Sequence, residues 1–390
     1  MRSSYSEEDV ILLLKDITGL VEPQSTKERE RQIQSGRHYC EMLPIEYVPS
    51  GSYMEAYREA LKHYARPTAA AVEQLARKVM DARGKNVVLV SLARAGIPIG
   101  ILLKRCIYAV YGVRVPHYSI SIIRGRGIDQ NAMKYLLARH PAGDLLFVDG
   151  WIGKGAILNE LRAAVSDWPG VSPELAVAAD PANVTALCGT HEDILIPSSC
   201  LNSTVSGLIS RTFLRDDIIG PDDFHGAVYY ENLRDSDLSY EFIHAIEAEF
   251  SGNRAAGGDV DGQAVHGVAG AGHGELAEDA GAQALSGGAG MRLCEPADDA
   301  GAPVHGVDEV RAIAARFGVD DINLVKPGIG EATRVLLRRV PWKVLAAENA
   351  LSDPALTHIL RLAGEKGVPV EPYPLVRYKA CGIIKKLADA

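Results

Sequence analysis

One segment constrains the fold of this chain more than any other. Leu145–Leu158 reads LLFVDGWIGKGAIL: a buried-strand pattern that ends at Asp149, a turn with three glycines, and a helical pattern from Ala156. A strand that turns through glycines into a helix favours the binding of an anion, because the N–H groups of the turn and of the helix N-terminus point toward the same site. The segment therefore predicts a phosphate site, with an ordinary strand–helix connection as the alternative.

Further strands with helices between them are predicted on both sides of this segment. Buried or alternating apolar patterns occur at 86–92, 115–123, 174–179 and 193–197. Strands that alternate with helices indicate an α/β fold with a doubly wound parallel sheet, whose ligands bind beyond the carboxyl ends of the strands. The polar residues expected at those ends are Arg94, Arg124, Arg126, Asp149 and Ser198.

Composition divides the chain into three parts. Residues 251–305 contain 13 Gly and 13 Ala, which predicts a flexible linker because little apolar surface is available for burial. The domains expected on either side are 1–250 and 306–390. Because the apolar run near the N-terminus is short, we expect neither a signal peptide nor a membrane span there. Six scattered cysteines are typical of reduced thiols in a cytoplasm. Their spacing predicts no metal site.

The third part is a compact αβα unit by its pattern. A glycine-containing loop opens a helix at 328–334, strands are predicted at 342–347 and 368–371, and helices at 356–366 and 378–387. Residues 306–390 carry 13 Lys or Arg against 10 Asp or Glu. A glycine loop at the start of a helix, followed in the sequence by basic residues, favours binding to the phosphate backbone of a nucleic acid. Nucleic acid is therefore one predicted partner.

Two motifs resemble type I phosphoribosyltransferases. VVLVSLARAGIPIG at 87–100 is similar to the pyrophosphate loop of that family, and LLFVDGWIGKGAI to its loop for phosphoribosyl pyrophosphate, although Gly150, Lys154 and Ala156 depart from the usual pattern. The resemblance implies transfer at the anomeric carbon, with Mg²⁺ expected beside pyrophosphate.

The resemblance also implies roles for individual residues. Catalytic roles fall on Asp149, Lys154, Arg124 and Arg126. Phosphate and ribose contacts fall on Arg94, Ala95, Gly96, Gly150, Gly153, Gly155 and Ala156. The candidates for contacts with the acceptor substrate are His38, Tyr39, Glu41, Ser198, Ser199 and Asn202.

The DGW-x-GKG form more closely resembles the divergent phosphoribosyltransferase-like proteins of bacterial tellurium-resistance gene clusters, which are also classed as StiP-type cysteine proteases. This resemblance covers about 1–250 and implies a stress-response context. The tail resembles the Pelota-type branch of the kink-turn-binding ribosomal protein superfamily, with Gly330 in place of an asparagine. It implies binding of structured RNA through Gly328, Gly330, Glu331, Arg334, Arg338 and Lys379.

Three functions compete at this point. The first is a phosphoribosyltransferase-like enzyme with an RNA-binding tail, and the second is a non-catalytic regulator that binds nucleotide or RNA. The third is a cysteine peptidase that uses Cys200 with His191 or His225, since such chemistry requires a thiolate beside a base. The expected partners are phosphoribosyl pyrophosphate or a similar ribose phosphate and structured RNA; a homodimer is compatible with this scheme.

Overall fold

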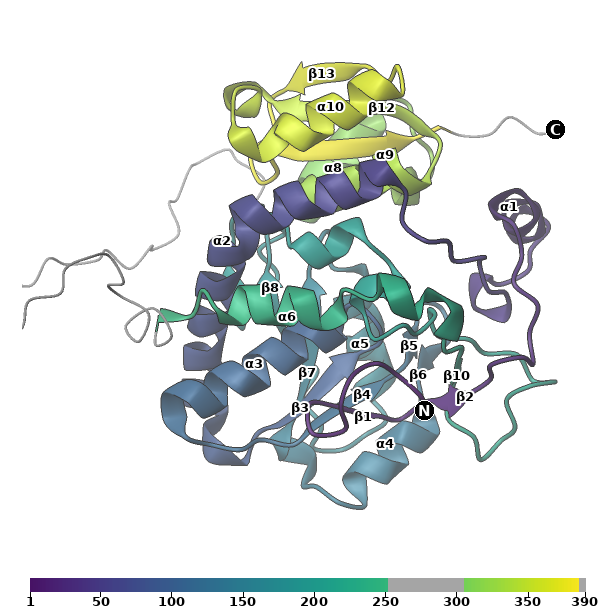
Figure 1. Ribbon diagram of the computed structural model, residues 1–390, viewed down its shortest axis with the longest axis vertical. Coiled ribbons are helices and arrows are strands. Elements are labelled where there is room, and N and C mark those ends of the chain that lie inside the picture. The colour runs from purple at the N-terminus through teal and green to yellow at the C-terminus, as the bar shows by residue number, and fades with distance from the viewer. Residues whose placement is uncertain (252–304, 386–390) are drawn as a thin grey trace, which may run out of the picture.

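A parallel six-stranded sheet forms the centre of the larger body of the chain. The computed structural model describes residues 1–251 and 305–385 (Figure 1). The strand order is β1-β4-β3-β7-β8-β9, and all neighbours are parallel. The strands are β1 (Ile11–Leu12), β3 (Val88–Leu92), β4 (His117–Ile120), β7 (Leu145–Trp151), β8 (Leu175–Ala179) and β9 (Cys188–Thr190). The predicted α/β fold with a parallel sheet is confirmed.

Helices cover both faces of this sheet because its strands are apolar on both sides. One face packs against α2 (Gly51–Arg83), α3 (Gly96–Tyr111) and α6 (Ser239–Glu247). The other packs against α4 (Gln130–Leu137) and α5 (Ala156–Val165). Side chains alternate accordingly: Leu89 and Leu146 face the first group, whereas Val90 and Phe147 face the second.

The strand order reverses between β3 and β7, where ligands of doubly wound sheets bind. The start of α3 lies directly against the end of β7 there. A Cβ on Gly96 would be 2.4 Å from the carbonyl oxygen of Val148, so only glycine permits this approach.

Short elements complete the larger body. They are α1 (Thr26–Gln34), a parallel pair of β2 (Lys15–Asp16) with β10 (Gly226–Ala227), and an antiparallel pair of β5 (Ile122–Ile123) with β6 (Gly127–Ile128). No helix within 1–251 or 305–385 is long and apolar enough to cross a membrane.

The C-terminal body has a four-stranded mixed sheet, in the order β11-β14-β12-β13. Its strands are β11 (Val325–Pro327), β12 (Pro341–Ala347), β13 (Val370–Tyr373) and β14 (Ala380–Ile384). Helix α8 (Gly306–Arg316) packs on one face, and α9 (Ile329–Arg338) with α10 (Thr357–Glu365) on the other.

The two bodies share one apolar core. Ile329, Leu336 and Ile359 belong to the same buried cluster as Tyr57 and Ile196 of the larger body. Figure 1 shows α9 and α10 lying over α2, and Arg361 of α10 pairs with Glu59 of α2 at 3.1 Å. The C-terminal body is therefore docked firmly on the larger one.

Several predicted elements were wrong. The strand predicted at 193–197 is irregular, and β9 is the edge strand instead. Residues 380–384, predicted as helix, form β14 between β11 and β12. The predicted linker at 251–305 lies, apart from its two end residues, outside the described residues.

Candidate cysteine–histidine–aspartate site

The predicted phosphate loop between β7 and α5 is closed by the C-terminal body. The Lys154 ammonium donates to the carbonyl oxygens of Ile322 at 2.7 Å and Val325 at 3.3 Å. The Tyr378 hydroxyl donates to the carbonyl oxygen of Gly153 at 2.7 Å. Gly155 has a φ of +82° and caps α5, which begins at the next residue. Groups of the C-terminal body therefore engage Lys154 and Gly153 of the predicted phosphate loop.

Asp149 lies at the end of β7, as predicted, but is partly buried and accepts from the Gly150 N–H at 2.7 Å. Burial raises the pKa of its carboxyl group to about 7. Because desolvation disfavours the charged form, the site is poorly suited to holding a carboxylate against ribose hydroxyls.

The predicted arginines pair with protein groups. Arg94 donates to Asn202 Oδ1 at 3.1 Å, Glu46 at 3.2 Å and the carbonyl oxygen of Ile209 at 2.8 Å. Arg124 donates to the Asn323 side chain at 2.7 Å. Arg126 donates to Glu41 at 2.9 Å.

The predicted acceptor residues separate into two groups. His38 and Tyr39 contact the backbone of Arg124, at 3.1 and 2.9 Å. Glu41 of this first group pairs with Arg126. Ser198, Ser199 and Asn202 line a small cavity of about 40 Å³ between the two bodies. Its lining includes Ser198, Ser199, Asn202, Arg94, Ala95, Trp151 and Arg334.

The predicted RNA-binding residues lie largely at the interface between the two bodies. Gly328 and Gly330 are buried, next to Asp193 and Ser199 respectively. Arg334 lies over the Trp151 ring, 5.5 Å from its centre, and pairs with Glu331 at 3.1 Å. Lys379 pairs with Asp353; the side chain of Arg338 is outside the described part of the structure.

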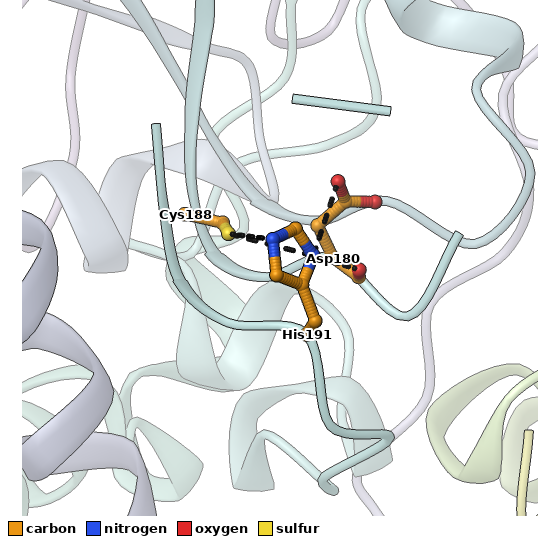
Figure 2. Close-up of side chains that lie close together, drawn as sticks. All are labelled: Asp180, Cys188 and His191. Atoms are coloured by element: carbon orange, nitrogen blue, oxygen red, sulfur yellow. Dashed lines mark hydrogen bonds and ion pairs between the residues drawn. The ribbon is translucent and has the colours of Figure 1, made fainter. Parts of the chain in front are cut away.

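A different cluster at the sheet edge has the parts of a nucleophilic site. Figure 2 shows the His191 ring between the Cys188 thiol and Asp180. His191 Nε2 is 3.3 Å from Cys188 Sγ, and Nδ1 is 3.0 Å from the carbonyl oxygen of Asp180 and 3.8 Å from its carboxylate. Cys188 begins β9, His191 follows that strand, and Asp180 follows β8.

This geometry fixes the hydrogen-bonding roles of the imidazole. The carbonyl oxygen of Asp180 can only accept, so Nδ1 carries the proton. In the neutral ring, Nε2 is then the unprotonated nitrogen, as a general base requires, and Cys188 Sγ lies beside the ring, 3.3 Å from Nε2 and 3.7 Å from Nδ1. A third group that orients the base completes the arrangement used by nucleophilic hydrolases.

The members of the cluster differ in their exposure to solvent. Cys188 is 0% exposed, whereas the His191 side chain is 42% exposed. Burial raises the pKa of the Cys188 thiol to about 11, and the Lys78 ammonium, 3.9 Å from Sγ, acts in the opposite direction. The Asp180 carboxyl accepts from the amides of Val184 and Thr185 at 2.7 and 2.8 Å, and burial raises its pKa.

The same side chains also form a possible metal-ligand set, which the sequence spacing did not predict. Asp180, Cys188 and His191 each offer one ligand atom, all within 4.8 Å of one another. Asp180 Oδ1 is buried and has no hydrogen-bond partner among the described residues. A thiolate, an imidazole and a carboxylate suit Zn²⁺.

The histidines proposed for Cys200 lie elsewhere. His191 is beside Cys188, and His225 contacts the Ser121 hydroxyl at 2.8 Å. Cys200 Sγ faces the carbonyl oxygen of Ala56 at 3.9 Å. A second cysteine–histidine pair joins Cys40 Sγ to His38 Nδ1 at 2.9 Å, but the neighbouring Glu41 is engaged by Arg37 and Arg126.

Sequence reasoning missed Cys188 and Asp180. The available signal was a Cys-x-x-His spacing that spans a short strand, with Asp-Pro eight residues upstream of the cysteine. That spacing gains meaning only when β8 and β9 are known to be neighbours, because their carboxyl ends then meet.

Comparisons with known proteins match each of the two bodies to a family. A family model described as "Tellurite-like stress resistance cysteine protease StiP" matches residues 3–247. A model described as "PELOTA RNA binding domain" matches residues 304–386. The cysteine protease StiP of Acinetobacter baylyi is 33% identical over 98% of this chain and 94% of its own length.

A solved hypoxanthine-guanine phosphoribosyltransferase from Bacillus anthracis matches 35% of this chain and 72% of its own, at 12% identity and a TM-score of 0.20. So weak a likeness carries no argument. The prediction of phosphoribosyl transfer is wrong, because the family model and the relative both describe a cysteine protease. The expected Mg²⁺ is not tested by these findings.

Proposed function

Because the chain belongs to the StiP cysteine protease family, we propose that it hydrolyses peptide bonds with Cys188 as the nucleophile. The observation that carries this proposal is the 3.3 Å approach of His191 Nε2 to Cys188 Sγ, with Asp180 behind the ring. The stress-response setting of tellurite resistance is part of the proposal, as is structured RNA as a partner of 305–385.

The reaction follows from the roles of the three side chains. His191 Nε2 takes the thiol proton, and the thiolate sulfur forms a bond to the carbonyl carbon of the substrate. The imidazolium then gives its proton to the departing amine as the C–N bond breaks. Water, deprotonated by His191, attacks the thioester, and the returning proton restores the thiol as the acid leaves.

Two neighbours assist this cycle. Asp180 holds Nδ1–H through its carbonyl oxygen and favours the imidazolium through its carboxylate. Lys78 favours the thiolate, because a cation near the sulfur lowers the pKa of the thiol.

Three alanine substitutions test the assignment. Cys188→Ala should abolish cleavage of fluorescein-labelled casein, whereas Cys200→Ala and Cys40→Ala should retain it, with circular dichroism confirming that each variant folds. Iodoacetamide should label Cys188 in step with the loss of activity. Activity that survives Cys188→Ala but not Cys40→Ala would assign the chemistry to the Cys40–His38 pair.

A further inference from the structure

The face of the C-terminal body that contacts the larger body binds a carboxylate, the side chain of Asp193 in the larger body. The Ile329 amide donates to both carboxylate oxygens of Asp193, at 3.0 and 3.1 Å, and the Lys379 amide donates at 2.9 Å. Asp193 is 5% exposed, and burial raises its pKa to about 6. Gly328, with a φ of +93°, brings the loop to within contact of this carboxylate. The loop that sequence reasoning assigned to RNA is thus occupied from within the chain.

Cations from both bodies gather beside that loop. Lys154 and Arg124 contact the 322–325 segment, and Lys326 follows it. Burial and then the neighbouring cations lower the pKa of Lys154 to about 8. Burial, Arg339, Arg334 and Arg124 also lower the pKa of Lys326, although Glu331 opposes them. Phosphate groups are the partner whose charge suits such a cluster.

The docked body also holds the segments that surround the proposed nucleophile. Asp193 is two residues beyond His191. The Gly306 amide donates to the carbonyl oxygen of Ala182 at 2.9 Å, and His305 Nδ1 lies 3.1 Å from that of Asn183. These contacts fix the turn after Asp180, while Cys188 is 0% exposed. This arrangement therefore restricts the access of a substrate carbonyl to the sulfur.

We infer that structured RNA and the larger body compete for the Gly328–Arg334 face of the C-terminal body, and that undocking by RNA uncovers the Cys188 thiol. The second half of this inference rests on the proposed function. The shared apolar core holds the closed form in the absence of RNA. RNA phosphates would replace the Asp193 carboxylate on the Ile329 and Lys379 amides and neutralise the cations freed by opening.

A disulfide between the two bodies provides the test. A Cβ on Gly330 would lie 3.7 Å from the Cβ of Ser199, which is within the range that disulfides require. The full chain carrying Ser199→Cys and Gly330→Cys is compared in its oxidised and reduced forms. The probes are a synthetic kink-turn RNA hairpin, a fully paired hairpin as control, and labelled casein with and without the kink-turn RNA.

We expect the oxidised form to bind the kink-turn RNA at least 30-fold more weakly than the reduced form. With RNA present, it should cleave casein at least tenfold more slowly. Wild-type protein given the same oxidant controls for damage to Cys188. In a second variant, Asp193→Ala should bind the hairpin more tightly than wild type, whereas Asp308→Ala, which removes an exposed aspartate of the C-terminal body, should not.

Each outcome decides one part of the inference. Equal RNA binding by the oxidised and reduced forms overturns the competition. Blocked RNA binding with equal casein cleavage overturns the uncovering of the thiol and leaves the peptidase assignment standing. If the oxidised form binds RNA more weakly than the reduced form and neither form cleaves casein, the result supports the competition and contradicts the peptidase assignment.

Discussion

Gly189 sets the distance between the edge strand β9 and helix α2, and replacing it should separate activity from stability. A Cβ at this position would be 2.1 Å from the carbonyl oxygen of Ala71 and 2.7 Å from that of Ala178. The first of these distances is 1.3 Å short of the 3.4 Å at which ordinary van der Waals contact begins. In Gly189→Ala, β9 must therefore move away from α2 by about that amount, and Cys188 and the backbone of His191 move with it.

The expected losses follow from this displacement. Overpacking of this kind costs about 1–3 kcal/mol, and each kcal/mol lowers the melting temperature of a domain this size by about 2–4 °C. The displacement moves Cys188 and His191 relative to Asp180, which follows β8, and a misplacement of about 1 Å in a catalytic site costs up to about 100-fold in rate. Activity should therefore fall by one to two orders of magnitude at a temperature where the protein is still folded.

The assays are thermal denaturation and casein cleavage at 25 °C. The matched control is Gly364→Ala in α10, where a Cβ would meet nothing within 4 Å and alanine favours the helix by about 1 kcal/mol. That variant should be slightly more stable and fully active. If Gly189→Ala loses stability but cleaves casein at the wild-type rate, β9 does not carry the catalytic residues.

Three further predictions concern charge at the two sites. Lys78→Met should slow iodoacetamide labelling of Cys188 at a given pH, because loss of the nearby cation raises the pKa of the thiol; an unchanged pH profile would contradict this. Zn²⁺ should inhibit cleavage and protect Cys188 from labelling, with EDTA reversing both, because the thiolate, imidazole and carboxylate converge; labelling unaffected by Zn²⁺ would exclude that ligand set. Asp149 has a pKa raised to about 7 in the folded state, so folding binds its proton more tightly and wild-type stability falls as pH rises from about 4 to about 7. The free energy of unfolding of Asp149→Asn, relative to that of wild type, should therefore rise by about 1 kcal/mol per pH unit in that window. An equal difference in melting temperature between variant and wild type at pH 5 and at pH 8 would show that burial does not raise the pKa of this carboxyl group.

The sheet was predictable where local pattern and burial agree. The runs that became β3, β7 and β8 are apolar on both faces, and glycines mark the turns into α3 and α5. Local pattern failed where partners decide the structure. Residues 380–384 resemble a helix in isolation, yet they form a central strand because β11 and β12 pair on either side.

The site could not be predicted for a related reason. Asp149 and Lys154 occupy the positions that their motif implied, but the C-terminal body covers the loop, and no local pattern encodes that contact. Cys188 and His191 are close in the sequence, but nothing there distinguishes them from Cys40 and His38. The acid that completes the cluster comes from the adjacent strand, so only the strand order reveals it.

Helix α2 contacts both the C-terminal body and the proposed nucleophile, so its length determines whether both contacts can form. Near its start the Tyr53 hydroxyl bonds to the carbonyl oxygen of Leu337, and near its end Lys78 lies beside Cys188. One inserted residue between these points would rotate one end by about 100° and shift it by about 1.5 Å. Both contacts could not survive together, so the length of α2 fixes the position of the C-terminal body relative to the edge strand β9.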